Sequence, residues 1–356
     1  MRKGKIYFAI IALCFLGIFF TGRKQAKAKS LPLAVLTYAS SLHDKFNIPG
    51  DLGICGSQLC LVDYGNRRIQ TFKIKNDGWP PTHVSNFGKE GTNLGEFNFG
   101  RFLSFADYGK YCYIADSGNN RIQIFSVDEK NNLAPLSATG KEGKELGNFL
   151  GLPNLSLAVS GQYLYVGDSG NSRIQVFNIG DDGKLTPKLA FGKAGENPGE
   201  FGLLSKPIGT PGPLYLTASG HYLYVYDSGN SRIQVLSIKE DGALTPKFAF
   251  NQENKKSDKF IQISGITAYK NHLFLADSGS NLIHIFTINY DGSLEPEISV
   301  GKNAKNGGEI GKLFGICAGE KFLYCSDTEK NALKIYFIEP FEKKYSQTGE
   351  IAFRAP

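Results

Sequence analysis

An aspartate followed five residues later by an arginine is the most repeated charged pair in this chain. The clearest copy, D-S-G-N-S-R-I-Q-V-F, begins at Asp168. Whole or eroded copies begin at Asp63, Asp116, Asp168, Asp227, Asp277 and Asp327, and the arginine is present as Arg68, Arg121, Arg173 and Arg232. Three kinds of chemistry fit this pattern: a ring of ligand-binding arginines, a calcium loop, or carboxylate–guanidinium pairs inside the fold.

Repetition within one chain favours the third interpretation. A residue that recurs in every repeat meets a demand that every repeat makes, and such a demand is structural. A buried guanidinium needs acceptors, which the aspartate and the turn carbonyls would supply. Leu282 and Ala332 replace the arginine in the last two copies, so a ligand-binding ring would be broken. The turn also lacks the further carboxylates of a calcium loop.

The elements around the motif are short strands. The copies begin about 50 to 59 residues apart, a spacing typical of repeat arrays. Each repeat holds four apolar stretches, which in the third copy lie at residues 155–160, 163–167, 173–179 and 188–191. A Gly turn, the aspartate motif and an Asp-Gly hairpin signal separate these stretches. This pattern predicts an all-β fold, a six-bladed β-propeller of four-stranded antiparallel blades.

A second phrase joins successive repeats. It reads F-G-K-E-G-T-N-L-G-E-F from Phe87 to Phe97, and similar phrases run from Gly140 to Phe149 and from Phe191 to Phe201. Together, the aspartate motif and this phrase resemble the NHL repeat over essentially all of the chain after residue 31. The resemblance implies a six-bladed propeller. It leaves activity open, because such propellers include interaction platforms, RNA binders, sensor domains and lyases.

Two segments compete to close the sixth blade. Residues 31–46 align without gaps on residues 186–201, which makes Leu33–Tyr38 a candidate outer strand. The tail at Ile351–Phe353 resembles the same outer strand and is the alternative. We favour the N-terminal strand, because it would tie the first blade to the last.

Unrepeated residues at the channel mouth are the candidate binding residues. Alignment of the inner strands places one residue of each repeat in a ring: Asp51, Phe102, Asn154, Pro213, Ile263 and Leu313. The polar residues of this ring and of the preceding position could form a mixed rim: Asp51, Arg101, Asn154, Gln262 and Lys312. Deeper positions are small except for Tyr215, which could narrow the channel or stack on a ligand. A solvated rim without a ligand remains the alternative.

The sequence offers no catalytic or metal site. The five histidines, His43, His83, His221, His272 and His284, are scattered and are expected at the surface. A catalytic zinc site usually needs three protein ligands, which these positions do not supply. No G-x-S-x-G elbow is present. We therefore predict no catalytic residues, no metal and no cofactor.

The N-terminus has the pattern of an export signal. A basic start precedes an apolar run from Ile6 to Phe20, and Ala26-Lys27-Ala28 fits a cleavage site. The run of 15 residues is shorter than the roughly 20 that span a bilayer as a helix. We predict that residues 1–28 are a signal peptide, or an uncleaved membrane anchor, and that residues 31–356 form a secreted or periplasmic propeller.

The net charge argues against nucleic acid. Six of the basic side chains lie in residues 1–28, and the remainder has 34 basic against 33 acidic residues. No basic block follows that could supply phosphate contacts, so we predict no nucleic-acid partner.

Five cysteines lie after the export segment: Cys55, Cys60, Cys112, Cys317 and Cys325. An odd number leaves at least one unpaired. A Cys55–Cys60 bridge across a hairpin is one possibility. Cys55 and Cys317 occupy the same repeat position in neighbouring blades. Buried free thiols are the alternative that we favour.

These observations support two functions. The first is an interaction or sensor module that binds a protein or glycan through the loop-bearing face. The second is a metal-dependent lyase or lactonase with its site at the channel mouth.

Overall fold

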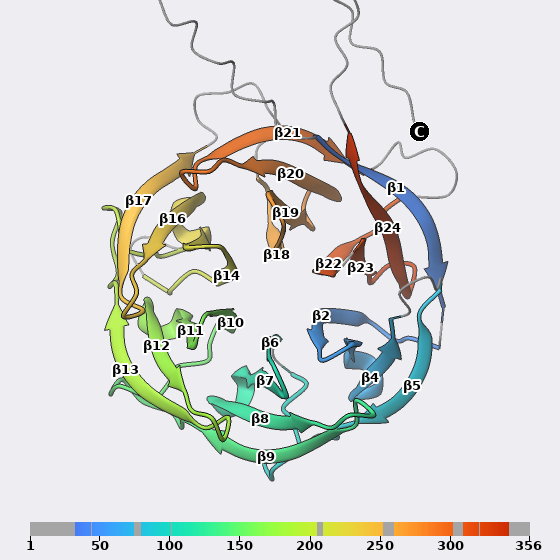
Figure 1. The fold of residues 1–356 in the computed structure, drawn as a ribbon, viewed down its shortest axis with the longest axis horizontal. Coiled ribbons are helices and arrows are strands. Elements are labelled where there is room, and N and C mark those ends of the chain that lie inside the picture. The colour runs from blue at the N-terminus through green and yellow to red at the C-terminus, as the bar shows by residue number, and fades with distance from the viewer. Residues whose placement is uncertain are drawn as a thin grey trace, which may run out of the picture. The chain divides into compact units, whose positions relative to one another are not determined.

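The computed structural model describes residues 33–43, 45–74, 80–100, 102–204, 209–251, 260–301, 309–319 and 321–341, with backbone alone for 33–41 and 339–341. These residues form six four-stranded antiparallel sheets, which are the blades of a ring (Figure 1). The predicted six-bladed β-propeller is confirmed. No helix among these residues is long and apolar enough to cross a membrane.

The blades follow one another along the chain. Blade 1 consists of β2 (Pro49–Cys55), β3 (Gln58–Asp63), β4 (Arg68–Lys73) and β5 (Thr82–Phe87). Blade 2 consists of β6 (Leu103–Tyr108), β7 (Tyr111–Asp116), β8 (Arg121–Val127) and β9 (Leu133–Thr139). Blade 3 consists of β10 (Leu155–Ser160), β11 (Tyr163–Asp168), β12 (Arg173–Ile179) and β13 (Leu185–Phe191).

The remaining blades have the same order from the channel outward. Blade 4 consists of β14 (Leu214–Ser219), β15 (Tyr222–Asp227), β16 (Arg232–Ile238) and β17 (Leu244–Asn251). Blade 5 consists of β18 (Ile263–Tyr269), β19 (His272–Asp277), β20 (Leu282–Ile288) and β21 (Leu294–Val300). Blade 6 consists of β22 (Leu313–Gly319), β23 (Phe322–Asp327), β24 (Ala332–Phe341) and β1 (Leu33–Leu42).

The N-terminal strand closes the ring. β1 pairs antiparallel with β24 from Leu33 opposite Phe341 to Leu42 opposite Leu333. The preference for Leu33–Tyr38 as the outer strand of blade 6 is thus confirmed. The competing tail at residues 351–353 lies outside the described residues, as does the predicted export segment at 1–28.

The aspartate motif turns the chain between the second and third strand of a blade. In blades 1 to 4 the three residues after the aspartate form a short 3-10 turn, and the next residue is left-handed with φ near 50°. These turns, η1 to η4, are Tyr64–Asn66, Ser117–Asn119, Ser169–Asn171 and Ser228–Asn230. They lie at the same end of the blades as the segments that cross to the next blade. We call this end the loop-bearing face.

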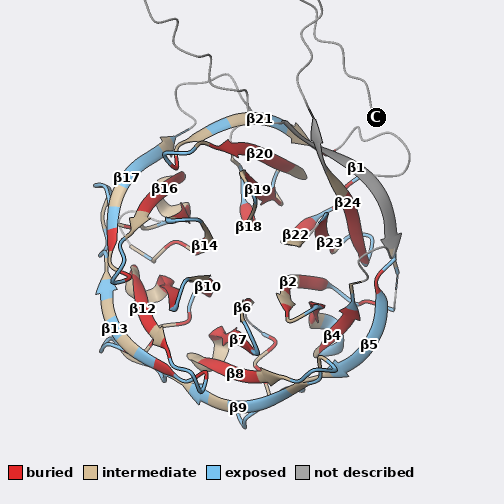
Figure 2. Ribbon diagram, in the orientation of Figure 1, coloured by how far each residue is buried: buried red, intermediate tan, exposed pale blue. Residues whose placement is uncertain are grey.

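Burial follows the order of the strands. The second strand of each blade is buried along most or all of its length, while β5, β9, β13 and β17 alternate or face solvent (Figure 2). The joining phrase supplies Phe97, Phe149 and Phe201, which are at most 1% exposed and pack in the cores around the blades. Apolar burial between flat sheets is the main stabilising term of such a ring.

The disulfide differs from both pairings that the sequence offered, and it shows that the favoured expectation of free thiols was wrong for Cys55 and Cys112. Cys55, at the end of β2, is bonded to Cys112, near the start of β7, with a Cα–Cα distance of 5.3 Å. Cys55 lies opposite Gln58 in the hairpin and Cys60 opposite Gly53, so the two cysteines are not directly paired. The bond joins blade 1 to blade 2. Among the described residues Cys60, Cys317 and Cys325 are free and buried.

Two histidines are not at the surface. His272 and His284 are 4% and 3% exposed, whereas His43, His83 and His221 are exposed. Both buried histidines lie in blade 5, where His284 Nε2 is 3.3 Å from Asp277 Oδ2. The surface expectation was wrong for both, because His284 takes the strand position that Gln175 holds in blade 3 and His272 begins the buried strand β19.

Candidate functional site

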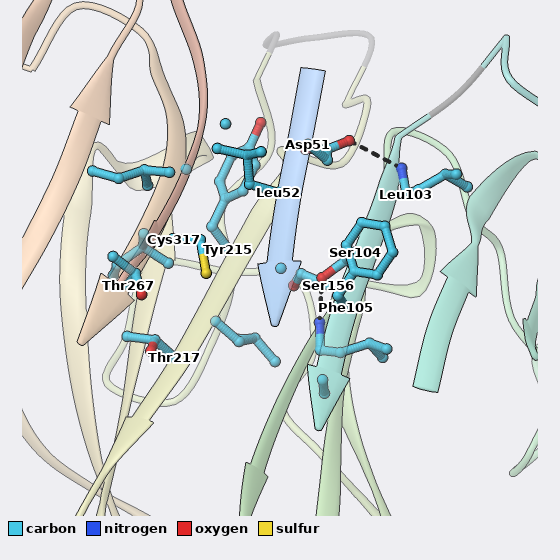
Figure 3. Close-up of a pocket in the computed structure, with 18 of the residues that line it drawn as sticks. Asp51, Leu52, Leu103, Ser104, Phe105, Ser156, Tyr215, Thr217, Thr267 and Cys317 are labelled. Carbon is cyan, nitrogen blue, oxygen red and sulfur yellow. Dashed lines mark hydrogen bonds between the residues drawn. The ribbon is translucent and has the colours of Figure 1, made fainter. Parts of the chain in front are cut away.

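The inner strands of all six blades enclose one cavity of about 220 Å³ along the axis of the ring. It is several times larger than the roughly 30 Å³ that one water occupies in the liquid, and smaller than most drug-sized pockets. Figure 3 shows its lining, with Asp51 and the hydroxyl of Tyr215 toward one end and Thr217 toward the other. Asp51 and the Tyr215 hydroxyl therefore mark one end of the cavity (Figure 3).

Strand pairing shows which residues are level in this cavity. In each blade, the residue two positions before the motif aspartate pairs with a residue of the inner strand, and the level residue comes immediately before that partner. The six level residues are Asp51, Ser104, Ser156, Tyr215, Gly265 and Gly315. The sequence alignment had put Asp51 level with Phe102 and Asn154. That placement was wrong by two residues, because each level residue precedes its motif aspartate by 12 positions, whereas the alignment used 14 in the other five blades.

Asp51 and Tyr215 face each other across this level. They come from blades 1 and 4, which lie opposite each other in the six-membered ring (Figure 1). The other four residues of the level are serines or glycines, so they leave room for the phenol. The electrostatic influence of Asp51 contributes to raising the pKa of Tyr215, after the larger effect of burial. The charge state of Asp51 and that of Tyr215 are therefore electrostatically linked.

Asp51 is held by blade 1 and blade 2 together. Its Oδ2 accepts a hydrogen bond from the Tyr64 hydroxyl at 2.5 Å and another from the Leu103 backbone N–H at 3.0 Å. Burial nevertheless raises the pKa of this carboxyl to about 7, and the two hydrogen bonds only partly oppose that rise. Asp51 therefore changes its charge near neutral pH.

Tyr64 is the site residue that sequence reasoning missed. It occupies the place of Ser117 and Ser169 in the motif, and these serines accept the N–H of Leu155 and Leu214 in the next blade. The Tyr64 hydroxyl accepts the N–H of Leu103 in the same way, at 3.1 Å. The signal was the departure of D-Y-G-N from the D-S-G-N of the following repeats.

Three of the predicted mouth residues line the cavity: Asp51, Asn154 and Tyr215. Asn154 is 2% exposed and joins two blades, because its Nδ2 donates to Leu214 O and its Oδ1 accepts from the Ser169 hydroxyl. Gln262 and Lys312 are exposed and are not part of the lining. Arg101 lies outside the described residues.

Hydroxyl groups are distributed along the cavity, from the level of Asp51 to the end at Thr217 (Figure 3). Ser104 Oγ, Thr217 Oγ1 and Thr267 Oγ1 each accept a backbone N–H from the inner strand of the next blade. Ser156 differs, because its Oγ is buried and has no hydrogen-bond partner among the described residues. A buried hydroxyl without a partner costs free energy unless a ligand or water satisfies it.

The repeated arginines lie away from the cavity. In blade 3, Arg173 Nε donates to Asp168 Oδ2 at 2.8 Å. Its terminal nitrogens donate to three carbonyls of the segment that enters the blade, those of Lys144, Glu145 and Asn148. Arg121 and Arg232 repeat this arrangement in blades 2 and 4. These guanidinium groups have no free edge toward the channel.

The donor set does not suit a metal ion. Within the described residues no three His, Cys, Asp or Glu side chains gather where they could hold one. The cavity contains two carboxyl groups, Asp51 and Asp107, and Asp107 accepts the Gly56 N–H at 2.7 Å. Calcium takes six to eight oxygen ligands and zinc about four protein or water ligands.

The fold and the cavity define a six-bladed propeller with a polar, ligand-sized channel. The sequence model of the family described as "Lactonase, 7-bladed beta-propeller" matches the chain twice in succession, over residues 54–207 and 208–355. The chain belongs to this family, although its described residues close the ring with six blades. None of the curated proteins matches the sequence.

Solved structures share the fold over most of the chain. An auxiliary nutrient binding protein from Bacteroides ovatus is 14% identical, with a TM-score of 0.53 over 86% of this chain and 77% of its own. A functionally unknown protein from Desulfotomaculum acetoxidans is 14% identical, with a TM-score of 0.52 over 92% of each chain. A protein from Lactobacillus plantarum is 15% identical, with a TM-score of 0.50 over 90% of this chain and 86% of its own. At these identities the likeness concerns the fold alone.

Proposed function

We propose that the chain is an exported binding or sensor module of the NHL-repeat type, which takes its ligand at the channel mouth on its loop-bearing face. The observation that carries this proposal is the cavity, where Asp51 and Tyr215 lie opposite each other, Tyr64 binds Asp51 from outside the lining, and Ser156 Oγ lacks a partner among the described residues. A concave site with a few convergent polar groups is typical of ligand binding. The repeat motifs support the NHL type, and the pattern of residues 1–28 supports export.

We propose further that the partner is a protein or glycan that approaches the same face. Several large apolar side chains on the segments between blades are at least 45% exposed: Ile48, Leu94, Leu146, Leu152, Leu204 and Ile261. Exposed apolar groups among polar ones are a common feature of protein contact surfaces. They would surround the channel mouth rather than fill it.

A thermal-shift screen against saccharides, sugar lactones, amines and short peptides tests the binding function. Because a ligand that binds only the folded state stabilises it, a true ligand raises the melting temperature with concentration. The Asp51→Asn variant is expected to lose this response. The matched control Asp128→Asn, in an exposed hairpin on the opposite face, keeps it. A melting temperature that no compound class moves would contradict the proposal.

Lactone hydrolysis is the second candidate, because the family is a lactonase family and Asp51 has a pKa of about 7. A carboxylate with this pKa is suited to take a proton from an attacking water at neutral pH. The test is proton release from sugar lactones between pH 6 and pH 8. Hydrolysis that rises through pH 7 and falls at least about 100-fold in Asp51→Asn would support this candidate. Rates equal to the uncatalysed background would exclude it.

A further inference from the structure

The lining of the cavity is acidic. Its described residues carry two carboxyl groups, Asp51 and Asp107, and no lysine, arginine or histidine. A site lined by one sign of charge with poorly solvated walls attracts the opposite charge. An anionic ligand such as a phosphate ester would find no cationic partner among these residues, so the lining favours a cation.

Aromatic rings lie near the Asp51 end, where Phe102 and Tyr215 line the cavity, whereas Tyr64 and Phe314 are not among its lining residues. The rings of Phe102 and Phe314 are stacked with centroids 5.4 Å apart, and the ring of Tyr64 meets Phe314 edge-on at 6.0 Å. Tyr64 is hydrogen-bonded to Asp51, and Tyr215 approaches from the opposite blade. Aromatic faces beside a carboxylate are the arrangement by which proteins bind organic ammonium groups, through cation–π attraction.

The same groups suit a metal ion or a sugar less well. A hard metal cation needs several oxygen ligands, but only one carboxylate lies at this end of the cavity. The volume of about 220 Å³ also leaves a bare ion poorly surrounded. A neutral sugar needs many fixed hydrogen-bonding groups, whereas Ser104, Thr217 and Thr267 already accept backbone N–H groups.

We propose that the channel binds an organic ammonium ion, with its charge beside Asp51 and its carbon atoms against Phe102 and Tyr215. The inference rests on the proposed binding function and names the chemistry of the ligand. Ser156 Oγ, buried and without a partner, is available to a polar group on the body of that ligand. The ammonium group is carried either by a small molecule or by a lysine side chain of a partner protein.

The charge state of Asp51 makes the inference measurable. Burial holds the pKa of this carboxyl at about 7, and Tyr64 and Tyr215 are the titratable neighbours that the structure places beside it. Both phenols stay neutral below pH 9, since burial raises the pKa of each. A permanently charged ammonium ion binds the ionised carboxylate, so its affinity rises as the pH increases from 6 to 8. The affinity of a neutral ligand does not rise.

Isothermal titration of the full chain with choline and its uncharged isostere 3,3-dimethylbutan-1-ol tests this directly. We expect choline to bind at least about tenfold more tightly at pH 8, and this preference to shrink at pH 6. Asp51→Asn, which keeps the shape of the side chain, is expected to abolish the preference. Asp128→Asn, in the exposed hairpin on the opposite face, is the control and keeps the preference.

The outcomes separate the inference from the function on which it rests. Equal affinity for choline and the neutral alcohol overturns the ammonium assignment and leaves the binding module standing. The same holds when choline, butylammonium and Nα-acetyl-lysine amide all fail at pH 8 while another compound class shifts the melting temperature. Failure of every class overturns both. Tighter binding of the lysine amide than of choline and butylammonium identifies a protein side chain as the source.

Discussion

Blades 2 to 4 differ from blades 5, 6 and 1 in how the chain enters each blade. In blades 2 to 4 an arginine binds three carbonyls of the entering segment, and the inner strands pair without a bulge. In blades 5 and 6 Leu282 and Ala332 take that place. The inner strands of blades 5, 6 and 1 all contain a register shift. One half of the ring is regular, and the other half is altered.

The motif aspartate makes one hydrogen bond that is common to both halves of the ring. In every blade its carboxylate accepts a backbone N–H from the segment that enters the inner strand. The donors are Asn47, Asn98, Leu150, Gly202, Gln262 and Lys312. The arginine makes its carbonyl contacts in blades 2 to 4, which follow the full joining phrase. The aspartate therefore holds the entering segment in every blade, whereas the carbonyl contacts of the arginine occur where the full joining phrase precedes the blade.

Replacing Asp168 by alanine is expected to have the largest effect. It leaves Arg173 and Gln175 without their buried acceptor and frees the Leu150 N–H. Loss of one partner from a buried charged pair costs about 3–5 kcal/mol of unfolding free energy. Chemical denaturation measures this, with exposed Asp128→Ala as the control. A loss below about 1 kcal/mol would mean that water replaces the carboxylate.

Arg173→Leu copies the residue of blade 5 into blade 3. We expect a loss of about 2–3 kcal/mol, because three carbonyls and a buried carboxylate lose a charged donor. A variant as stable as the wild type would contradict a stabilising role of the arginine in blades 2 to 4. Urea unfolding followed by circular dichroism gives the value.

Arg68→Leu should cost less, about 1 kcal/mol. The side chain of Arg68 is 29% exposed and, within the described part of the chain, bonds only to Asp63, whereas that of Arg173 is 13% exposed and has four acceptors. Exposed ion pairs contribute little. Equal losses for the two variants would show that the carbonyl contacts add nothing.

Leu282→Arg restores the motif in blade 5, and we expect no gain in stability. Asp277 already accepts four backbone N–H groups and lies beside His284, so a guanidinium finds its acceptor occupied. A gain above about 1 kcal/mol would contradict the link between the arginine and the joining phrase. Differential scanning calorimetry of the variant beside the wild type measures the change.

The regular half of the ring is the part that sequence predicts well. The repeat determines strand order and turn position, because the same apolar stretches and turn residues recur in each blade. Closure by Leu33–Tyr38 was also accessible, because the strand keeps the pattern of the other outer strands. The level of Asp51 was accessible as well, because it precedes its motif aspartate by the same 12 residues as Ser104 and Ser156, although the alignment placed it two positions away.

The candidate site falls where the repeat is eroded. Tyr64 and Asp51 both lie in blade 1, and their contact depends on a tyrosine where the other blades have serine or threonine. Tyr215 could be predicted as an exception among small residues, but its position opposite Asp51 needed the ring geometry. The Cys55–Cys112 bond joins different strand positions of two blades, so repeat alignment alone could not find it.

The pairing of β1 with β24 has a consequence for the order of folding. Leu33 is among the first described residues to leave the ribosome, yet its partner, Phe341, is nearly the last. Contacts between residues so distant in sequence form slowly, since the chain between them must first be ordered. Until then β1 has no partner, and blade 6 has an open edge that invites pairing with another chain. The protein therefore passes through an open arc on its way to a ring, and a segment that binds the exposed edge of β24 at that stage would hold it there.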